Sequence, residues 1–433
     1  MKFTAVGDVL VQRRLPETYD GFEAVREWLA PAQARYFNLE TTLHREGECF
    51  GFALSGGSWL RSEPEVVDDC KRYGFNMTSF CNNHTMDYAF DGLLKTKEYV
   101  DRSGLVNTGA GRNLDQAAAP AYLETPNGRV ALLAMTATCN SYYNDVCIAG
   151  KQSRRAPGRP GVNQLRFKET LFVTQEQMDQ IKLIAELTEV NGQEEIGRRE
   201  GFRDPLPEGV FKLGKYMNFK LSDKTGRETV CNAADMKRME QGIYEARSQA
   251  DFVLVSIHSH EVGGMSKEQP AQFVEEFAHK CIDLGADAVI GHGPHLLRPI
   301  EIYKGKPIFY SLGDFVMQTR NKNFSVEEEY AEQGLTSDAP MQEVRRIKSR
   351  DNTRGLRTDR RMYEAVIPRW EMENGVMTKL ELLPIELGFA LPASREGLPA
   401  PAKDDAILRR LEEMSAPYGT KFVIKDGIAE VVL

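Results

Sequence analysis

The chain has 433 residues, of which 41% are hydrophobic and 27% charged, and its formal net charge is -8. This length predicts either one large domain with insertions or two domains. The composition is typical of a soluble globular protein, no apolar run approaches the roughly 18 residues of a membrane span, and the acidic charge argues against general nucleic-acid binding.

The N-terminal segment and the cysteines both favour a reducing, intracellular setting. The opening MKFTAVGDVLVQRR has one lysine and then a short apolar run that Asp8 interrupts, which is not the pattern of a secretion signal. The seven cysteines are an odd number, are widely scattered and form no C-x-x-C pair, so neither a disulfide framework nor a zinc ribbon is indicated. We expect reduced thiols and a cytoplasmic protein.

Short apolar runs bounded by turn residues alternate with helical patterns. The predicted strands cover 3–6, 36–39, 75–80, 130–134, 252–257, 288–290 and 308–312. The predicted helices between them include 64–73, 90–103 and 270–284. Several of the strands are almost continuously hydrophobic, as strands buried on both faces are. The pattern predicts an α/β fold with layers of helix and sheet.

Two segments interrupt this alternation, so we expect a core made of residues 1–149 and 236–320. Residues 150–235 are an expected insertion, mainly helical or irregular, that serves as a lid or specificity segment. In it, Thr174 and Gln177 form a capping-box pattern at the start of a helix.

Residues 321–361 are expected to form an exposed basic loop, because eight Lys and Arg lie between 345 and 361. Such a loop is either a solvated segment or a means of capturing an anionic substrate. Residues 362–433 are expected to complete the core with further strands. Among them, 363–370 and 376–387 alternate in hydrophobicity and are joined near Asn374-Gly375, which predicts a hairpin.

Polar side chains that can bind metal follow six of the predicted strands. In chain order they are Asp8, then Asn38 and Glu40, then Asn82, Asn83 and His84, then His258, His260 and Glu261, then His292 and His295, and finally Asp314. If the strands are parallel, their carboxyl ends meet at one edge of the sheet.

A metal centre is the natural reason for these side chains to converge. Taken singly, Asp8 or Asn82 reads as a turn residue and His258 as a hydrogen-bonded core histidine. Their coincidence at six strand ends favours a shared site. Carboxylates and imidazoles without cysteine suit one or two divalent ions, Mn, Zn, Fe or Mg. Such ions make water nucleophilic near neutral pH, which is the chemistry of hydrolysis.

The same residues resemble the CapA family of poly-gamma-glutamate capsule biosynthesis proteins. The resemblance rests on GDVL at 7–10, FNLE at 37–40, NNHTMDYAFDGL at 82–93, HSHE at 258–261 and the block at 285–316 that contains GHGPH and SLGDF. It implies a metallophosphatase-like fold, a four-layer αββα sandwich of the calcineurin-like phosphoesterase superfamily. It also implies a role in capsule biosynthesis.

The resemblance implies a role for each residue of the site. The implied metal ligands are Asp8, Glu40, Asn83, His258 and His292. His84 resembles the general acid of the family, and His295 and Asp314 are further catalytic candidates. Candidate substrate-binding residues are Asn82, His260, Glu261 and Arg298.

The chain departs from the phosphoesterase pattern at two places. Leu10 stands where D-x-H would place a histidine, and His292 and His295 are one residue further apart than in G-H-x-H. One of two metal positions has therefore lost a ligand.

We predict a metal-dependent hydrolase that cleaves an anionic substrate, a gamma-glutamyl polymer or a peptide amide, with metal-activated water. One alternative is a phosphoesterase that acts on a phosphate mono- or diester. The other is a non-catalytic accessory protein of poly-gamma-glutamate synthesis or export, which would use the same pocket to bind the polymer.

Overall fold

Two large sheets make up the body of the protein. The computed structural model describes residues 1–139, 146–318 and 322–433. Within this part of the chain, ten strands form the first sheet: β1 (Lys2–Leu10), β2 (Ala34–Leu39), β5 (Met77–Ser79), β6 (Val106–Thr108), β19 (Asp314–Met317), β20 (Glu364–Glu373), β21 (Val376–Glu386), β22 (Ala400–Pro401), β23 (Phe422–Lys425) and β24 (Ile428–Val431). Six strands form the second sheet: β8 (Ala121–Thr125), β9 (Gly128–Thr136), β15 (Phe252–His258), β16 (Ala288–His292), β17 (Leu297–Tyr303) and β18 (Lys306–Leu312).

The seven predicted strands are confirmed, as parts of β1, β2, β5, β9, β15, β16 and β18. In the middle of the first sheet β1, β2, β5 and β6 run parallel. In the second sheet β9, β15, β16 and β18 run parallel, with antiparallel β8 and β17 at its edges. Strands buried on both faces carry the continuous apolar runs from which they were predicted.

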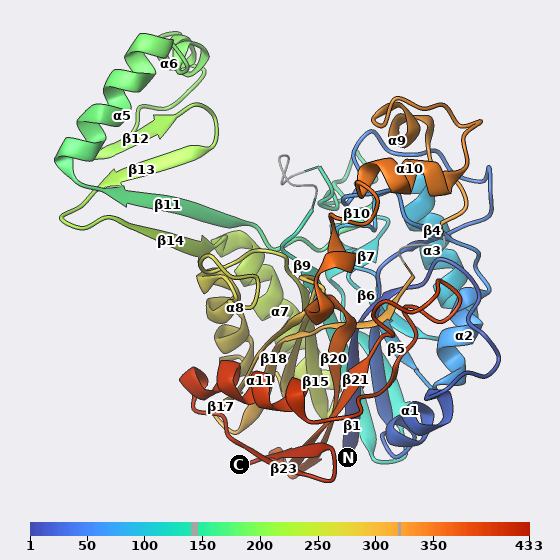
Figure 1. Ribbon diagram of the computed structural model, residues 1–433. Helices are drawn as coiled ribbons and strands as arrows, with labels where there is room; N and C mark the ends of the chain where they lie inside the picture. The colour runs from blue at the N-terminus through green and yellow to red at the C-terminus, as the bar shows by residue number, and fades with distance from the viewer. Residues whose placement is uncertain (140–145, 319–321) are drawn as a thin grey trace.

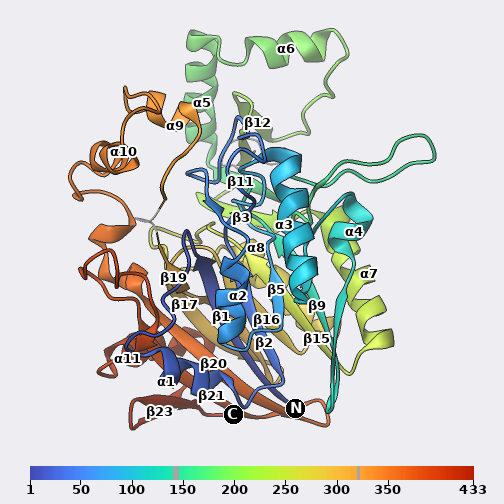
Figure 2. The same cartoon turned by 90° about the vertical axis from the view of Figure 1, so that its right-hand side faces the viewer.

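The two sheets pack face to face, and helices cover their outer faces (Figures 1 and 2). The core between the sheets joins Phe3 and Trp370 of the first sheet to Leu254 and Phe309 of the second. The rings of Phe3 and Trp370 are stacked with centroids 5.3 Å apart, an arrangement that adds to the area they bury. The order of layers is therefore helix, sheet, sheet, helix.

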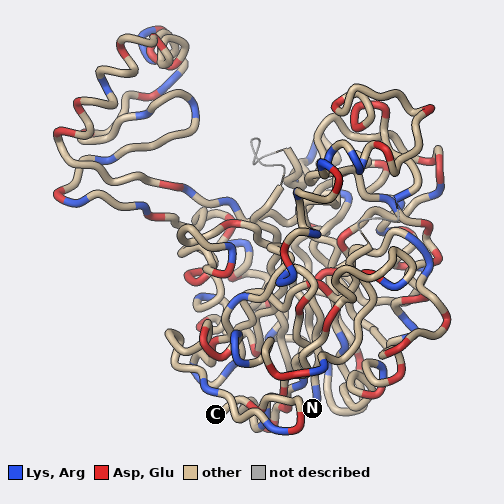
Figure 3. The backbone as a smooth tube through the Cα atoms, in the orientation of Figure 1, with Lys and Arg blue, Asp and Glu red and all other residues tan. Residues whose placement is uncertain are grey.

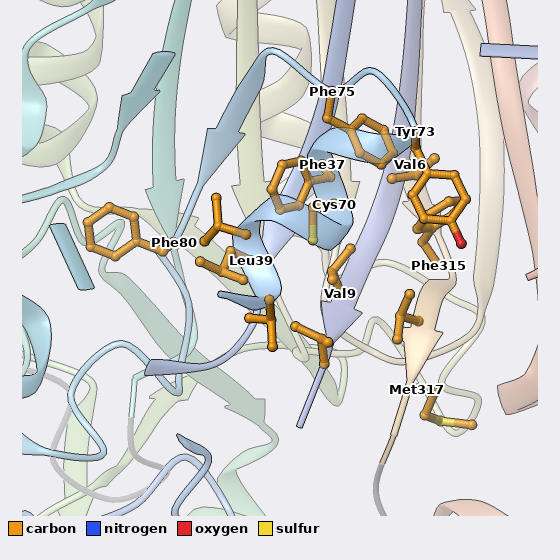
Figure 4. Close-up of a cluster of buried hydrophobic side chains, with 14 of the residues drawn as sticks. Val6, Val9, Phe37, Leu39, Cys70, Tyr73, Phe75, Phe80, Phe315 and Met317 are labelled. Carbon is orange, nitrogen blue, oxygen red and sulfur yellow. The ribbon is translucent and has the colours of Figure 1, made fainter. Parts of the chain in front are cut away.

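Each outer face has its own apolar core. Helices α1 (Phe22–Leu29), α2 (Val66–Arg72) and α3 (Ala89–Ser103) pack on the first sheet, and Figure 4 shows part of this core around Phe37 and Phe315. Helices α7 (Ala233–Gln249) and α8 (Gln272–Asp283) cover the second sheet. The other helices of the body are α4 (Leu114–Ala118), α11 (Ala406–Ser415) and η3 (Ala416–Tyr418). None of the helices in the described ranges is long and apolar enough to cross a bilayer.

Most residues of the insertion are helical or irregular, as expected, but it also contains a sheet that the sequence did not predict. Its larger part is an arm that extends away from the body (Figure 1), built on a four-stranded sheet in the order β12-β13-β11-β14. Its elements are β11 (Phe167–Val173), α5 (Gln175–Thr188), α6 (Gly192–Arg199), β12 (Val210–Leu213), β13 (Met217–Leu221) and β14 (Gly226–Cys231). Most residues of these strands are only half-buried or exposed, so their sequences lack the apolar runs that mark a buried strand.

The capping box predicted in this arm is confirmed. The side chain of Thr174 accepts a hydrogen bond from the backbone of Gln177, and the Gln177 side chain accepts one from the backbone of Thr174. This reciprocal pair satisfies amides that the first turn of α5 leaves without a helical partner.

The expected exposed basic loop at 321–361 is largely exposed, but over the residues that the structure describes it is folded and not a loop. The segment folds into α9 (Glu327–Ala331), α10 (Met341–Lys348), η1 (Leu356–Thr358) and the start of η2 (Arg360–Tyr363). Tyr330, Met341 and Val344 form a small buried core that holds α9 against α10. These few apolar residues could not be recognised from the sequence, because charged residues surround them.

The remaining strands are short pairs, and the C-terminal hairpin is confirmed. The pairs are β3 (Thr42–Leu43) with β4 (Arg61–Ser62) and β7 (Ala110–Gly111) with β10 (Gly161–Val162). β20 and β21 form an antiparallel pair whose turn is Asn374-Gly375, both at positive φ, as a tight hairpin turn requires.

The arm should be removable without loss of the body. Leu171 and Arg227 face each other across β11 and β14, so an Asn-Gly turn can join them in place of residues 172–226. Because the small core of Val173, Met178 and Phe219 is separate from the cores of the body, we expect the melting temperature of the body to shift by less than about 5 °C. Circular dichroism would measure this, and loss of a cooperative transition would contradict it.

Candidate metal centre

The parallel strands of both sheets end on the same side of the molecule, and the predicted polar residues meet there. Asp8 lies in β1 and Glu40 follows β2, while His258 and His292 are the last residues of β15 and β16 and pair with each other in register. Asp314 begins β19 beside Asp8. All five are buried. The site thus lies where the ends of the two packed sheets meet.

Asp8, His258 and His292 form one cluster of possible ligands. The Nδ1 atoms of the two histidines are 2.9 Å apart. They lie 3.6 Å and 3.4 Å from Oδ1 of Asp8. Two metal–nitrogen bonds of about 2.1 Å at a right angle place their nitrogens about 3 Å apart. The spacing of the two imidazoles is therefore that of neighbouring ligands of one ion.

A second cluster lies on the other side of the His258 ring. Nε2 of His258 is 3.1 Å from Nε2 of His260 and 3.9 Å from Oε1 of Glu40. On the opposite oxygen of Glu40, Nδ1 of His295 lies 3.9 Å away and also contacts Oδ1 of Asp314 at 3.1 Å. In each of the triads Asp8–His258–His292, Glu40–His258–His260 and Asp8–Glu40–His295, ligand atoms lie within 4.8 Å of one another.

Several buried polar atoms of the site have no hydrogen-bond partner among the described residues. They are Oε1 and Oε2 of Glu40, Oδ1 of Asn83 and Oδ2 of Asp314. An unpaired buried acceptor costs free energy, so folded proteins rarely keep one without a purpose. A divalent cation would be a partner for these oxygens. The residues present therefore fit a bound metal ion.

The carboxylate of Asp8 is held rigidly between the sheets. Its Oδ1 accepts a hydrogen bond from Asn38 at 2.7 Å, and its Oδ2 accepts one from the backbone amide of Gly293 at 2.8 Å. Gly293 has φ +124° and lies against the backbone of Ser259, so a side chain there would clash. Its close approach explains the G-H-G-P-H sequence: the glycine lets the loop after β16 bond to Asp8.

Backbone geometry and hydrogen bonds orient two of the histidines. Nε2 of His292 bonds to the hydroxyls of Ser256 and Tyr36 at 2.9 Å and 3.1 Å, which leaves Nδ1 facing Asp8. Outer partners of this kind fix the ring orientation of metal-binding histidines. His295 has φ +60°, a left-handed conformation that few non-glycine residues adopt and that is often found at functional sites.

Burial keeps the histidines of the first two clusters neutral. It lowers the pKa of His292 to about 3 and lowers the pKa of His260 well below its ordinary value. It also lowers the pKa of His258, against the opposing effect of Asp8. A neutral imidazole offers a nitrogen lone pair to a cation. These three rings are therefore in the protonation state that a metal ligand requires.

The pKa values of the Asp8 and Glu40 carboxyl groups are shifted in opposite directions. Burial raises the pKa of Asp8, but its hydrogen bond to His258 and the attraction of the neighbouring histidines in their protonated forms outweigh this, so the pKa lies below its ordinary value. Burial and the neighbouring charges of Asp8 and Asp314 raise the pKa of Glu40 well above its ordinary value. Without a cation the site thus disfavours the charge on Glu40, and a bound divalent ion would offset that cost.

His84 faces the same site and is held by a residue that sequence reasoning missed. Its Nδ1 contacts Oδ2 of Asp87 at 2.7 Å, and its Nε2 lies 3.7 Å from Oε1 of Glu40. The carboxylate of Asp87 also accepts hydrogen bonds from the amides of Gly56 and Leu60. Asp87 is therefore fixed and orients the ring. The sequence feature that could have revealed this pair is the i, i+3 spacing of His84 and Asp87 in N-H-T-M-D.

Three predicted substrate-binding residues are engaged elsewhere. Arg298 is fully buried, and its guanidinium donates to the backbone carbonyls of Ser259, His260, Glu261 and Lys267, so it clamps the loop after β15 and does not face a substrate. Asn82 closes the turn after β5 through Leu39 and His84. The carboxylate of Glu261 accepts hydrogen bonds from Thr138 and Ser259.

A cavity of about 440 Å³ opens beside the clusters. Asn83, His84, His260 and His295 line it on the side of the metal centre. Four cations line the rest: Lys267, Lys322, Arg345 and Lys348, with Glu329 as the single carboxylate. Of the lining residues, six come from the segment 322–356 and none from the insertion 150–235. Three of the four cations, Lys322, Arg345 and Lys348, therefore come from the segment 322–356.

A layered α/β protein with a buried carboxylate and imidazole centre is the class that the fold and the site define. The profile of the bacterial capsule synthesis protein family PGA_cap matches residues 2–319, and the chain belongs to this family. The resemblance noted from the motifs is confirmed.

Curated relatives extend over different shares of the chain. The uncharacterized protein y4sH of Sinorhizobium fredii is 32% identical over 99% of this chain and 92% of its own length. Capsule biosynthesis protein CapA of Bacillus anthracis is 23% identical over 75% of this chain and 62% of its own. PGA biosynthesis protein CapA of Bacillus subtilis is 26% identical over 43% of this chain and 37% of its own.

Replacing His258 should remove bound metal, because this ring contributes to two of the three triads. We expect His258→Ala to lower the affinity for Mn²⁺ or Zn²⁺ at least 10-fold, on the order of the effect of disturbing a metal site. His279→Ala is the matched control, since His279 pairs with Glu301 on the outside of the second sheet. Titration calorimetry with both ions would measure the change. Equal affinity in the two variants would contradict the assignment.

Proposed function

We propose that this protein is a metal-dependent hydrolase with a metallophosphatase-like, calcineurin-like phosphoesterase fold, and that it cleaves an amide bond in an anionic gamma-glutamyl polymer or peptide. The order of layers, with the site at the carboxyl ends of two packed sheets, supports this fold. The name of the Bacillus subtilis relative, PGA biosynthesis protein CapA, supports the polymer. The core 1–149 and 236–320, completed by the strands of 362–433, would carry the chemistry.

One observation carries the proposal: a single cavity is lined by Asn83, His260 and His295 of the metal centre and also by four cations. A substrate carboxylate held by Lys267, Arg345 or Lys348 would place a neighbouring bond near His260 and His295. Cationic side chains gain most from an anion in a partly enclosed site, where solvent screens little. The geometry therefore favours a substrate with a negative charge close to the bond that breaks.

The implied reaction needs few residues. Asp8, His258 and His292 would hold one divalent ion, and Glu40 and Asn83 are the remaining candidate ligands, for the same ion or a second one. A bound ion would supply Lewis acidity and would lower the pKa of water at the site. His84, oriented by Asp87, faces Glu40 with Nε2 and can deliver a proton to the leaving group. His295 and Asp314 form a hydrogen-bonded pair that can hold a proton at the opposite side of Glu40. Mn, Zn, Fe and Mg all suit this oxygen and nitrogen donor set.

The same site suits a phosphate ester, which is the second candidate. Lys267, Arg345 and Lys348 would hold phosphate oxygens as well as carboxylates. A non-catalytic role in polymer synthesis or export would use these cations alone and leave the oriented His84–Asp87 pair without a purpose. That pair is the reason to prefer an enzyme.

Substrate choice is tested with the purified protein and added Mn²⁺. We expect release of glutamate or short oligomers from a gamma-linked glutamate hexamer, and loss of that release on addition of a chelator. A chromogenic phosphodiester is the comparison. Chelator-sensitive cleavage of the ester alone would replace the amide proposal with the phosphoesterase, and cleavage of neither would contradict the hydrolase.

Asp87→Asn should slow turnover without emptying the site. The amide keeps the shape of the side chain but cannot accept the same set of hydrogen bonds, so the His84 ring loses its fixed orientation. We expect kcat to fall about 10²-fold, within the range of a general acid, with metal content and KM unchanged. Asp91→Asn, an exposed carboxylate of α3, is the control. Metal loss in Asp87→Asn would show instead that Asp87 supports the ligands.

A further inference from the structure

A second cavity, of about 690 Å³, adjoins the one at the metal centre. Six of its lining residues are cationic: Arg13, Arg345, Arg346, Lys348, Arg354 and Arg357. No carboxylate and no aromatic ring is among the residues described as lining it. Figure 3 shows lysine and arginine along α10, which forms one side of this cavity. The second cavity is therefore strongly positive, although the protein as a whole has a net charge of -8.

The two cavities are adjacent. Arg345, Lys348 and Leu356 line both of them. The shared residues lie on α10 and at the start of η1. An extended molecule at the metal centre would therefore have the second cavity next to it, across Arg345 and Lys348.

Part of the positive charge has no counter-ion within the protein. Arg357 pairs with Glu396 at 2.8 Å, and Arg346 reaches Asp351 at 3.3 Å in an exposed pair. Over the ranges that the structure describes, the guanidinium of Arg354 has no ion-pair partner, and that of Arg13 donates to the carbonyl of Ala393 only. Unpaired guanidinium groups in a hollow are suited to bidentate binding of carboxylate or phosphate.

The residues that line the second cavity suit a chain of small anionic groups better than a nucleic acid. Proteins that bind single-stranded nucleic acids combine positive charge with aromatic rings on which bases stack, and the residues found here supply charge alone. The volume of each cavity lies in the range that holds a small ligand, so the two together exceed the need of one compact molecule. The chemistry is that of a chain with repeated small anionic groups.

We propose that the cavity around Arg346 and Arg354 is a second anion subsite, which holds a carboxylate of the same extended substrate several units away from the bond at the metal centre. This inference rests on the proposed function and specifies the length of its substrate. A short substrate fills the first cavity only. A longer one gains the additional charged contacts, so affinity should rise with the number of anionic units.

The double variant Arg346→Gln, Arg354→Gln tests the subsite. Both side chains are exposed, so the fold should be unaffected, which a melting curve would verify. Arg409→Gln, at an exposed arginine of α11, is the control. Binding is measured by fluorescence anisotropy with labelled gamma-linked glutamate dimer and hexamer, on metal-loaded protein that carries His84→Ala to stop turnover.

We expect the dissociation constant of the hexamer to rise at least ~5-fold in the double variant, as loss of charge-assisted contacts predicts, and that of the dimer to change less than ~2-fold, the scale of a screened distant charge. An unchanged hexamer affinity, or an equal loss for dimer and hexamer, would overturn the subsite. Inorganic polyphosphate of the same charge is the second probe. If it binds in an arginine-dependent way and the hexamer does not, the carboxylate occupant is wrong.

The two proposals fail separately. Arginine-dependent binding of the hexamer, with no cleavage by the wild-type protein, would refute the hydrolase and support the subsite. Cleavage of the hexamer with the same KM in wild type and double variant would refute the subsite and leave the hydrolase standing.

Discussion

The fold depends on one buried charge, the carboxylate of Asp8, at the junction of the two sheets. A carboxylate withdrawn from water is costly unless hydrogen bonds and opposite charges surround it. Asn38 of the first sheet and Gly293, which follows a strand of the second, each donate to one of its oxygens. No residue larger than glycine fits at position 7 of this junction, since its Cβ would lie 1.8 Å from the carbonyl oxygen of Gly313. The same carboxylate therefore joins the sheets and faces the histidines.

This arrangement divides the work between the body and its inserted segments. The packed sheets fix the ligand atoms, because each lies in a strand or within a few residues of one. The segment 322–356 supplies most of the cations of the first cavity and most of the lining of the second. Its own core is small, with Tyr330, Met341 and Val344 fully buried, and the buried pair of Lys322 and Glu329 ties it together. Substitutions in this segment can thus change which charged substrates bind without disturbing the metal ligands.

Sequence patterns predicted the central strands and the convergence of Asp8, Glu40, His258 and His292, because parallel strands in packed sheets bring their ends together whatever the length of chain between them. They did not predict the arm, whose strands are half-exposed and carry no apolar run. They also misplaced Arg298, because a position next to a histidine cluster does not reveal whether a guanidinium points to solvent or to buried carbonyls.

The basic residues of 345–361 show a different limit. Their sequence left open both a solvated segment and an anion-binding role, because the distance from the metal ligands depends on how α10 packs. Its anchors Met341 and Val344 are few among many charges. Asp87 was overlooked for a similar reason: a carboxylate three residues after a histidine is common, and only the fold shows that it bonds to the ring.

The central claim, one cation gathered by loops from distant parts of the chain, is tested most directly by anomalous diffraction from crystals of protein purified without chelator. A strong anomalous peak within bonding distance of Asp8, His258 and His292 is expected. A fully ordered site in which these three side chains surround only water, with stoichiometric metal bound at another place, would contradict the claim.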